Sequence, residues 1–226
     1  MSANSSPQRT ALLVGATGLI GHALLPVLLA DPRYRDVHVL LRRATPGLPS
    51  SARLRTHVVD FARLAEGVPA TDDLYCCLGT TIKAAGSEAA FRAVDFELVL
   101  ACARAALAAG ATCLAVVSAM GANANSSIFY NRVKGEMEAA VAALGFDSVC
   151  IARPSLLVGD RAALGQPVRA GEVWVRRLTL PLLPLVPRNL RPIEAGRVAR
   201  AMHFALEAPR AGTRVIESAE LNALGG

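Results

Sequence analysis

Short apolar runs alternate along this chain with longer segments that have helical spacing, from Ala11 onward. Continuous apolar runs of roughly four to eight residues are typical of strands buried on both faces of a parallel sheet. We therefore expect strands at 11–14, 36–41, 53–59, 73–78, 112–118, 148–152 and 213–216. Helical patterns predict helices at 19–30, between 86 and 110, at 127–144 and at 194–206.

The repeated order of strand and helix predicts the fold class. Alternating elements with short connections favour an α/β fold with a doubly wound parallel sheet, the Rossmann fold. We expect a single domain over 1–226, with a Rossmann core at 10–153 and a small substrate-side extension at 154–226 that closes the sheet. Ligands of such sheets bind beyond the carboxyl ends of the strands, so the loop after the first strand is the first candidate site.

The composition favours a folded globular protein. Hydrophobic residues make up 53% of the 226 residues and charged residues only 19%, whereas disordered chains have the opposite balance. The net charge of +6 comes mainly from arginines, because Lys83 and Lys134 are the only lysines among the 24 basic residues. These arginines are scattered along the chain, so we expect no nucleic-acid partner.

The cysteines and histidines indicate neither a disulfide framework nor a metal site. The cysteines are odd in number, lack CxxC spacing and lie in apolar segments; they are Cys76, Cys77, Cys102, Cys113 and Cys150. This usage predicts buried thiols, and we expect a cytoplasmic protein. The four histidines lack ligand spacing, so no metal is expected. No apolar segment has the length of a membrane span, and the polar segment 1–10 does not resemble a signal peptide.

A glycine-rich turn follows the first predicted strand, with the sequence Gly15-Ala16-Thr17-Gly18-Leu19-Ile20-Gly21. Glycine permits the positive φ of a tight strand-to-helix turn and leaves room for a pyrophosphate near the backbone. The helix that begins here would present free N–H groups to the phosphates. The GxxGxxG spacing is a variant of the dinucleotide fingerprint, and a plain tight turn is the alternative. The position of this turn in a βαβ unit favours cofactor binding.

The end of the second predicted strand indicates which dinucleotide binds. An NAD enzyme places an acid about 20 residues after the glycines, whereas an NADP enzyme places arginine near the 2′-phosphate. Here Arg42 and Arg43 follow the strand, and Asp36 lies at its wrong end. Two guanidiniums suit a dianionic phosphate through bidentate hydrogen bonds. We therefore expect NADP(H) rather than NAD(H), with an ordinary solvated arginine pair as the alternative.

Tyr130 and Lys134 are the main candidates for catalysis. They are four residues apart in a predicted helix, so they share one face. A neighbouring ammonium favours the phenolate form of tyrosine, and such a phenol can exchange a proton with a carbonyl or an alcohol. Lys134 would also bind the nicotinamide ribose, and Ser118, at the end of the fifth strand, would hold the substrate oxygen. A surface pair is the alternative, but the glycine turn and the serine favour catalysis.

Together these residues resemble the short-chain dehydrogenase/reductase superfamily. Within it, the sequence is similar to the atypical NAD(P)-binding branch that includes the HTATIP-interacting oxidoreductase family and its bacterial relatives. The similarity runs from Ala11 to about Leu206 and includes 76–81, 91–95, 133–136 and 153–155.

This resemblance implies a Rossmann fold that binds NADP(H), with Ser118, Tyr130 and Lys134 as the catalytic residues. It also implies that Asp60 approaches the adenine, although local chemistry alone makes Asp60 equally a cap of the following helix. The other cofactor-binding positions that it adds are Leu78, Gly79, Thr80, Arg153 and Pro154.

We therefore expect an NADP(H)-dependent oxidoreductase that acts on a small carbonyl or alcohol. The alternatives are an NADP(H)-sensing regulatory protein without turnover and an epimerase-like enzyme, which the short stretch after Pro154 disfavours. The apolar, proline-broken segment 178–186 and the nearby Trp174 could cover the core, line a substrate pocket, or contact a second copy or another protein.

Overall fold

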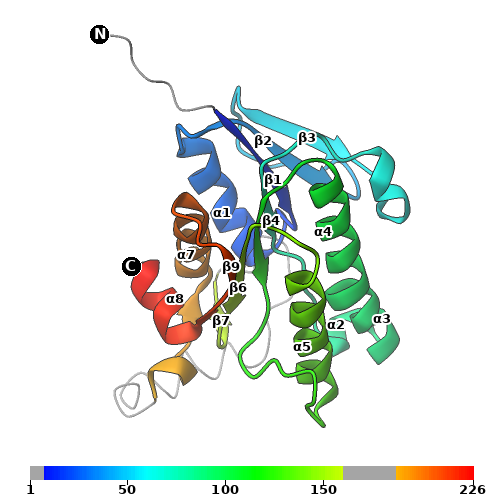
Figure 1. Ribbon diagram of the computed structural model, residues 1–226, viewed down its shortest axis with the longest axis vertical. Helices are drawn as coiled ribbons and strands as arrows, with labels where there is room; N and C mark the ends of the chain where they lie inside the picture. The colour runs from blue at the N-terminus through cyan, green and yellow to red at the C-terminus, as the bar shows by residue number, and fades with distance from the viewer. Residues whose placement is uncertain (1–7, 160–186) are drawn as a thin grey trace.

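The computed structural model describes residues 8–159 and 187–226, and a seven-stranded parallel sheet forms its centre (Figure 1). The strands of this sheet, in spatial order, are β3 (Leu54–Val58), β2 (Tyr34–Leu41), β1 (Arg9–Val14), β4 (Asp73–Cys76), β5 (Cys113–Val117), β6 (Ser148–Arg153) and β9 (Gly212–Glu217). A separate two-stranded parallel sheet is formed by β7 (Leu157–Val158) and β8 (Ile193–Glu194). The predicted doubly wound α/β fold is confirmed.

Helices cover both faces of the sheet (Figure 1). On one face lie α1 (Leu19–Ala30), α7 (Ala195–Glu207) and α8 (Ser218–Leu224), and on the other lie α4 (Val99–Ala108) and α5 (Phe129–Ala142). The remaining helical segments are α2 (Ile82–Ala85), α3 (Glu88–Arg92), the 3₁₀ helices η1 (Phe61–Glu66) and η4 (Arg188–Leu190), and the π-helical η2 (Ala93–Leu98).

The strand order places the candidate loops together. The chain moves outward from β1 to β2 and β3, then returns to place β4 on the other side of β1, so the order reverses between β1 and β4. Val14 is in register with Leu40 on β2 and with Cys76 on β4. The three loops that follow these strands therefore leave the sheet at one level, at the switch point where doubly wound sheets bind ligands.

The central strands are apolar on both faces because both faces are covered. Leu13 packs into the cluster under α1 and α7, whereas its neighbour Leu12 packs into the cluster under α4. Alternate residues of a strand point to opposite faces, so a strand between two helical layers needs apolar residues at every position. This burial makes the sheet a rigid support for the loops at its carboxyl edge.

The stretch 86–110, expected as one helix, is instead a succession of α3, η2 and α4. The π-helical turn lies in the middle and contains Asp95, whose side chain is buried. Wide turns of this kind are frequently found at functional sites. The segment 178–186 and Trp174 lie outside the described residues.

A buried polar network joins β1, β2 and β4 at the amino ends of these strands, opposite the candidate loops. The Tyr34 hydroxyl donates to Asp73 Oδ2 at 2.7 Å and lies 2.9 Å from the Tyr75 hydroxyl. Arg9 donates to both carboxylate oxygens of Asp73, at 2.6 and 3.0 Å. The two tyrosines and Asp73 are fully buried, so this network holds three neighbouring strands together through paired polar groups.

Replacing Tyr34 with phenylalanine should lower the free energy of unfolding by about 2 kcal/mol, because Asp73 loses a buried hydrogen bond that water cannot replace. The matched control is Tyr75→Phe, which should cost less, since within the described residues the Tyr75 hydroxyl bonds to Tyr34 alone. Urea unfolding followed by circular dichroism measures both. Equal losses would contradict the idea that the Asp73 contact dominates.

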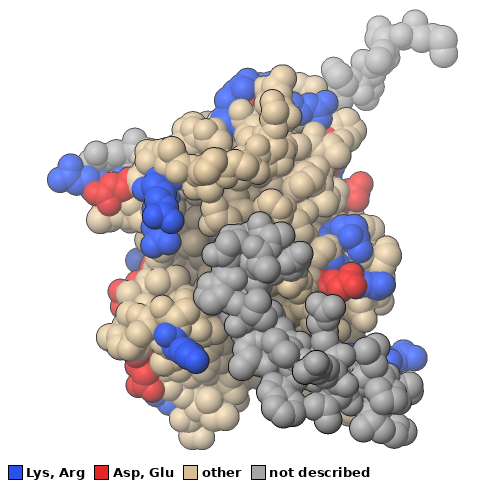
Figure 2. Space-filling view, turned by 180° about the vertical axis from the view of Figure 1, so that it is seen from behind, with Lys and Arg blue, Asp and Glu red and all other residues tan. Residues whose placement is uncertain are grey.

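The surface seen from behind in Figure 2 carries both signs of charge. Basic groups on this face are separated by uncharged surface and by acidic groups, so they form no continuous basic stripe there. Among the described residues, no helix combines the length and the hydrophobicity that crossing a membrane requires.

Candidate active site

The glycine turn joins β1 to α1 at the switch point. Gly15 has φ +85°, and a Cβ at this residue would lie 2.6 Å from the carbonyl oxygen of Cys77. A Cβ at Gly21 would lie 2.2 Å from the carbonyl oxygen of Gly15. Both glycines are therefore required by the close approach of the turn to the β4 loop and to the first turn of α1.

Gly18 differs from the other two glycines because no packing contact requires it. A Cβ at this position would be 3.4 Å from the carbonyl oxygen of Gly15, which is ordinary van der Waals contact. Gly18 is the N-cap of α1 and offers no side chain to the first-turn N–H groups. A helix N-terminus with open N–H groups is suited to a phosphate.

The other predicted residues of the turn fall into two kinds. Thr17 is exposed beside Gly18, so its side chain is available to a ligand as well as to its protein contacts. Leu19 and Ile20 are buried in the cluster under α1, so only their backbone N–H groups are candidates for cofactor binding.

Arg42 and Arg43 directly follow β2, and both side chains are exposed. Within the described part of the chain, neither guanidinium forms an ion pair, whereas Asp36, near the other end of the strand, pairs with Arg35 and Arg55. Arg42 and Arg43 are thus placed to meet an anion at the carboxyl edge of the sheet.

Asp60 accepts a hydrogen bond from the Ala62 N–H at 2.9 Å and caps η1, as its local chemistry predicted.

Tyr130 and Lys134 lie in the first turns of α5, as the sequence predicted. The Lys134 Nζ lies 2.8 Å from Asp95 Oδ1 and donates to the Val117 carbonyl at 3.5 Å. The side chains of Lys134 and Asp95 are only 3% and 1% exposed, so this is a buried ion pair. The Tyr130 ring packs at 5.2 Å from the Phe91 ring.

Ser118, at the end of β5, is 4% exposed, and its Oγ hydrogen bonds to no described residue. Its backbone N–H donates to the Ala152 carbonyl at 2.7 Å, which fixes the residue against β6. Buried hydroxyls normally have a partner, and an unsatisfied one calls for a functional explanation. A substrate oxygen would supply the missing partner.

The loop after β4 lies next to the buried ion pair of Lys134 and Asp95. The Thr80 N–H donates to Asp95 Oδ2 at 2.8 Å. A Cβ at Gly79 would lie 3.4 Å from Asp95 Oδ1 and 3.9 Å from Lys134 Nζ. Leu78 packs against the cluster under α4. Gly79 and Thr80 therefore border the buried ion pair, and Leu78 lies next to the glycine turn, since a Cβ at Gly15 would be 3.0 Å from the Leu78 N.

Asp95 is not among the predicted site residues, although it lies in one of the segments that carried the family resemblance. The sequence contains no distinct signal for it, because Asp95 is one of several charged residues in the Ala-rich stretch 86–110, with Glu88, Arg92, Glu97 and Arg104. The pairing with Lys134 depends on two segments 39 positions apart and on the π-helical turn. Local pattern therefore could not reveal it.

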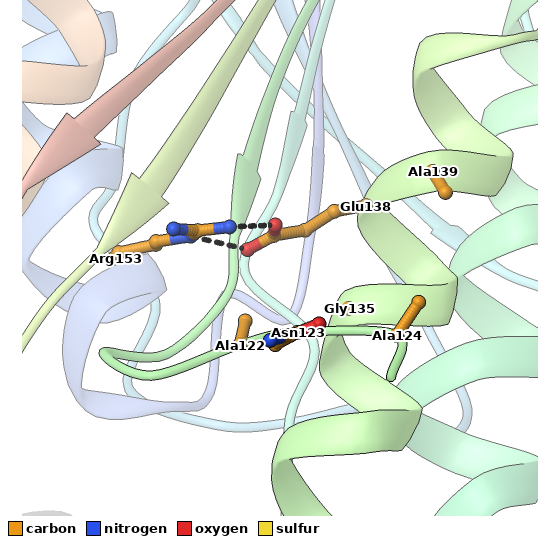
Figure 3. Close-up of a pocket in the computed structure, with 7 residues that line it drawn as sticks. All are labelled: Ala122, Asn123, Ala124, Gly135, Glu138, Ala139 and Arg153. Atoms are coloured by element: carbon orange, nitrogen blue, oxygen red, sulfur yellow. Dashed lines mark hydrogen bonds and ion pairs between the residues drawn. The ribbon is translucent and has the colours of Figure 1, made fainter. Parts of the chain in front are cut away.

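Arg153, which precedes Pro154, borders a hollow of about 430 Å³ together with Glu138 and Asn123 (Figure 3). The Arg153 guanidinium donates to both carboxylate oxygens of Glu138, at 2.9 and 2.5 Å, and to Glu217 at 3.1 Å. The carbonyl of Pro154 accepts from the Met120 N–H. Their contacts in this structure thus join β6 to α5 and to the loop after β5, and their role toward a cofactor stays a prediction.

The cysteines carry no redox or metal chemistry that the described residues reveal. All five are free, and burial raises the pKa of the Cys76 thiol to about 11 and that of Cys150 to about 12. Thiols of this kind stay protonated and unreactive near neutral pH. In the described ranges, no three histidine, cysteine or acidic side chains gather as metal ligands would.

Comparison with known proteins gives close sequence relatives. No protein-family model matches the chain. Protein FMP52, mitochondrial, from Eremothecium gossypii is 36% identical over 225 residues, which cover 95% of this chain and 96% of that protein. Protein HTATIP2 from Rattus norvegicus is 35% identical over 208 residues, which cover 90% of this chain and 84% of that protein.

Solved structures share the fold at lower identity. An oxidoreductase of the short-chain dehydrogenase/reductase family from Burkholderia thailandensis has a TM-score of 0.67 and 22% identity, covering 94% of this chain and 92% of that one. MoeE5 in complex with UDP-glucose and NAD has a TM-score of 0.66 and 17% identity, covering 92% of this chain and 75% of that one. At these identities the likeness establishes the Rossmann fold alone.

The relatives correct one prediction. The expected cytoplasmic location is wrong, because the FMP52 proteins of Eremothecium gossypii, Candida albicans and Emericella nidulans are named as mitochondrial. Cysteine usage separates oxidising from reducing compartments, and it contains no information that distinguishes one reducing compartment from another.

The predicted family resemblance is confirmed. Two relatives exceed a third of identical residues over nine-tenths or more of the chain, and the sheet order is that of the expected fold. The chain therefore belongs to the atypical short-chain dehydrogenase/reductase family that includes FMP52 and HTATIP2.

Proposed function

We propose that this protein is an NADP(H)-dependent oxidoreductase that acts on a small carbonyl or alcohol. The observation that carries the proposal is the buried Ser118 hydroxyl, which has no partner among the described residues and follows Val117, whose carbonyl accepts from Lys134 one turn after Tyr130 on α5. Most buried polar groups in proteins have a hydrogen-bond partner, whereas no described residue is a partner of the Ser118 hydroxyl. A reacting oxygen held between the serine and the phenol accounts for it.

The residues at the switch point fit a dinucleotide. The open N-terminus of α1 at Gly18 would hold the pyrophosphate, and the exposed Arg42 and Arg43 would hold a 2′-phosphate. The solved neighbour MoeE5 is described as a complex with UDP-glucose and NAD, which supports a dinucleotide as the ligand of this fold. When bound, NADPH supplies the hydride. The loop at Gly79 and Thr80 would border the nicotinamide half.

The side chains of this site divide the proton chemistry between them. Ser118 would donate a hydrogen bond to the carbonyl oxygen and hold it in line with Tyr130. As the carbonyl carbon accepts hydride, the Tyr130 O–H delivers its proton to that oxygen, and the product is an alcohol. Lys134 stabilises the phenolate that remains, through its positive charge. Oxidation of an alcohol reverses these steps.

Purified protein tests the proposal directly. NADPH binding is measured by fluorescence titration, and oxidation of NADPH is then followed with a panel of aldehydes and ketones. Turnover of any of these carbonyls supports the proposal. Tight binding without hydride transfer across the panel would instead favour a protein that senses NADP(H).

The paired substitution Arg42→Ala and Arg43→Ala tests the cofactor preference. It should weaken NADPH binding about 30-fold, because charge-assisted hydrogen bonds to the 2′-phosphate are lost. NADH has no 2′-phosphate, so its affinity should stay the same. Isothermal titration with both cofactors gives the two affinities. Equal losses for NADPH and NADH would remove the arginines from 2′-phosphate binding.

Arg35→Ala provides a matched control for that pair. Arg35 is also an exposed arginine of the β2 region, but it lies at the opposite end of the strand and pairs with Asp36. Its replacement changes the net charge without changing the carboxyl edge. We expect NADPH affinity to stay at the wild-type value in this variant.

A further inference from the structure

Two histidines lie side by side on neighbouring strands at one side of the sheet. His38 is on β2 and His57 is on β3, and His38 Nδ1 lies 2.9 Å from His57 Nε2. The register pairs Leu40 with His57, so the two histidines are diagonal neighbours across the strands. Leu40 packs into the cluster under α4, and His38, two residues earlier on the same strand, faces the same side of the sheet. Both histidines are partly buried.

The strand that carries His57 is weakly held. In the described sheet β3 is the edge strand, and its neighbour there is β2. None of the five residues of β3 is fully buried. Asp36 on β2 forms an ion pair with Arg55 on β3 at 3.2 Å, and pairs with an exposed side chain of this kind contribute little to stability. Beside the backbone ladder, the histidine pair is thus the partly buried polar contact that joins β3 to β2.

The short distance between the two ring nitrogens restricts how many protons the pair can hold. A hydrogen bond between imidazoles needs an N–H on one ring and a lone pair on the other. Two neutral rings satisfy this requirement, and so does one neutral ring beside one cation. When both rings are cations, each nitrogen carries a hydrogen, the hydrogen bond is lost and two like charges face each other. Uptake of the second proton therefore requires the rings to separate.

The surroundings also oppose protonation of His38. Burial lowers the pKa of His38 below its ordinary value of 6.5, and the adjacent His57 ring lowers it further. Asp36 favours the protonated form, whereas Arg55 and Arg35 oppose it. The residue of β1 in register with His38 is apolar. The charged side chains that begin η1 or lie on η1 and α4 are exposed at Asp60, Arg63 and Arg104.

We propose that the His38–His57 pair is a pH-sensitive latch that holds β3 on β2 near neutral pH and releases β3 in mild acid. A detached strand takes up the second proton at the ordinary pH of a histidine, about 6.5, whereas the closed latch resists it. The detached form therefore binds more protons below this pH, so the contact is stable above it and is lost as the pH falls. Arg42 follows His38 by four residues and Asp60 follows His57 by three, so the latch also sets how these two loops stand next to each other.

Hydrogen exchange of the full-length protein tests the latch without any ligand. NMR gives the protection factor of each backbone amide at about pH 7.5 and at about pH 5. Below about pH 6.5, the protection of the β3 amides should fall by up to about tenfold per pH unit, since one more proton is bound when β3 detaches. Amides of β5, a fully buried central strand, are the internal reference and should lose at least tenfold less over the whole range.

The His38→Gln variant should abolish this excess loss in β3. Glutamine still offers a hydrogen-bonding amide to His57, but it binds no proton in this pH range. His22→Gln is the matched control, because His22 is an exposed histidine on α1 and should keep the wild-type loss. A wild-type protein in which β3 and β5 lose protection equally overturns the proposal, and so does a loss that persists in His38→Gln.

The His57→Gln variant gives a second test that does not require His38→Gln to fold. Removing the competing cation should raise the pKa of His38, which is read from its imidazole resonance during an NMR titration. A pKa of His38 that stays constant or falls counts against the latch. Neither measurement uses cofactor or substrate, so the latch can be confirmed in a protein that turns over no carbonyl. Turnover without the excess loss in β3 would retain the oxidoreductase proposal and remove the latch.

Discussion

Replacing Tyr130 with phenylalanine is expected to lower kcat about 1,000-fold for any carbonyl that the protein reduces, because proton donation to the reacting oxygen is lost. The ring that packs on Phe91 is retained, so the fold and the approach of α5 to α3 should not change. NADPH affinity should stay close to the wild-type value, since the phenol acts on the substrate oxygen. Steady-state kinetics and NADPH titration measure the two quantities.

Phe129→Leu is the companion control for this substitution. Phe129 also packs near Phe91, with ring centres 6.2 Å apart, but it has no hydroxyl. This variant should keep turnover within about tenfold of the wild-type rate, since it changes packing and removes no proton donor. A Tyr130→Phe protein that retains wild-type kcat would remove the phenol from the mechanism.

Gly21→Ala is expected to lower the free energy of unfolding by about 3 kcal/mol, because the added methyl group overlaps backbone that cannot move freely. Its Cβ would lie 2.2 Å from the Gly15 carbonyl oxygen, in the turn that joins β1 to α1. Relief of this overlap requires α1 to shift away from the sheet. Chemical denaturation, compared between variant and wild type, measures the loss.

Gly18→Ala separates folding from binding within the same turn. Its backbone has φ −82°, which alanine adopts readily, and its Cβ would lie 3.4 Å from the Gly15 carbonyl oxygen, at ordinary contact distance. The stability loss should stay below about 1 kcal/mol, the usual range for an alanine N-cap. NADPH binding should nevertheless weaken, because the methyl group enters the space next to the open N–H groups. Equal stability losses in the two variants would contradict the distinction between them.

The local pattern of the sequence was sufficient to predict the sheet and the positions of its loops. Strands such as β1 and β5 are continuous apolar runs, and only a layer buried on both faces makes such runs stable in water. Gly15 and Gly21 mark a turn that other residues cannot adopt without overlap. Tyr130 and Lys134 were recognisable together because four residues make one helical repeat.

Contacts between distant segments were decided only by the tertiary structure. The pairing of Asp95 with Lys134 depends on a π-helical turn, and stretches of this kind resemble ordinary helix in sequence. The hydrogen bonds from Arg153 to Glu138 and Glu217 join β6 to α5 and β9. The Ser118 hydroxyl forms hydrogen bonds to no described residue, and this too depends on which side chains surround it.

The sequence by itself thus determined the alternation of elements, the glycine turn and the residue types at the sheet edge, because these depend on local sterics and on periodic burial. The tertiary structure decided which charges meet and which buried hydroxyl has no hydrogen-bond partner among the described residues. The physical reason is that electrostatic and hydrogen-bond energies depend on distance in space, and packing of the whole chain sets that distance.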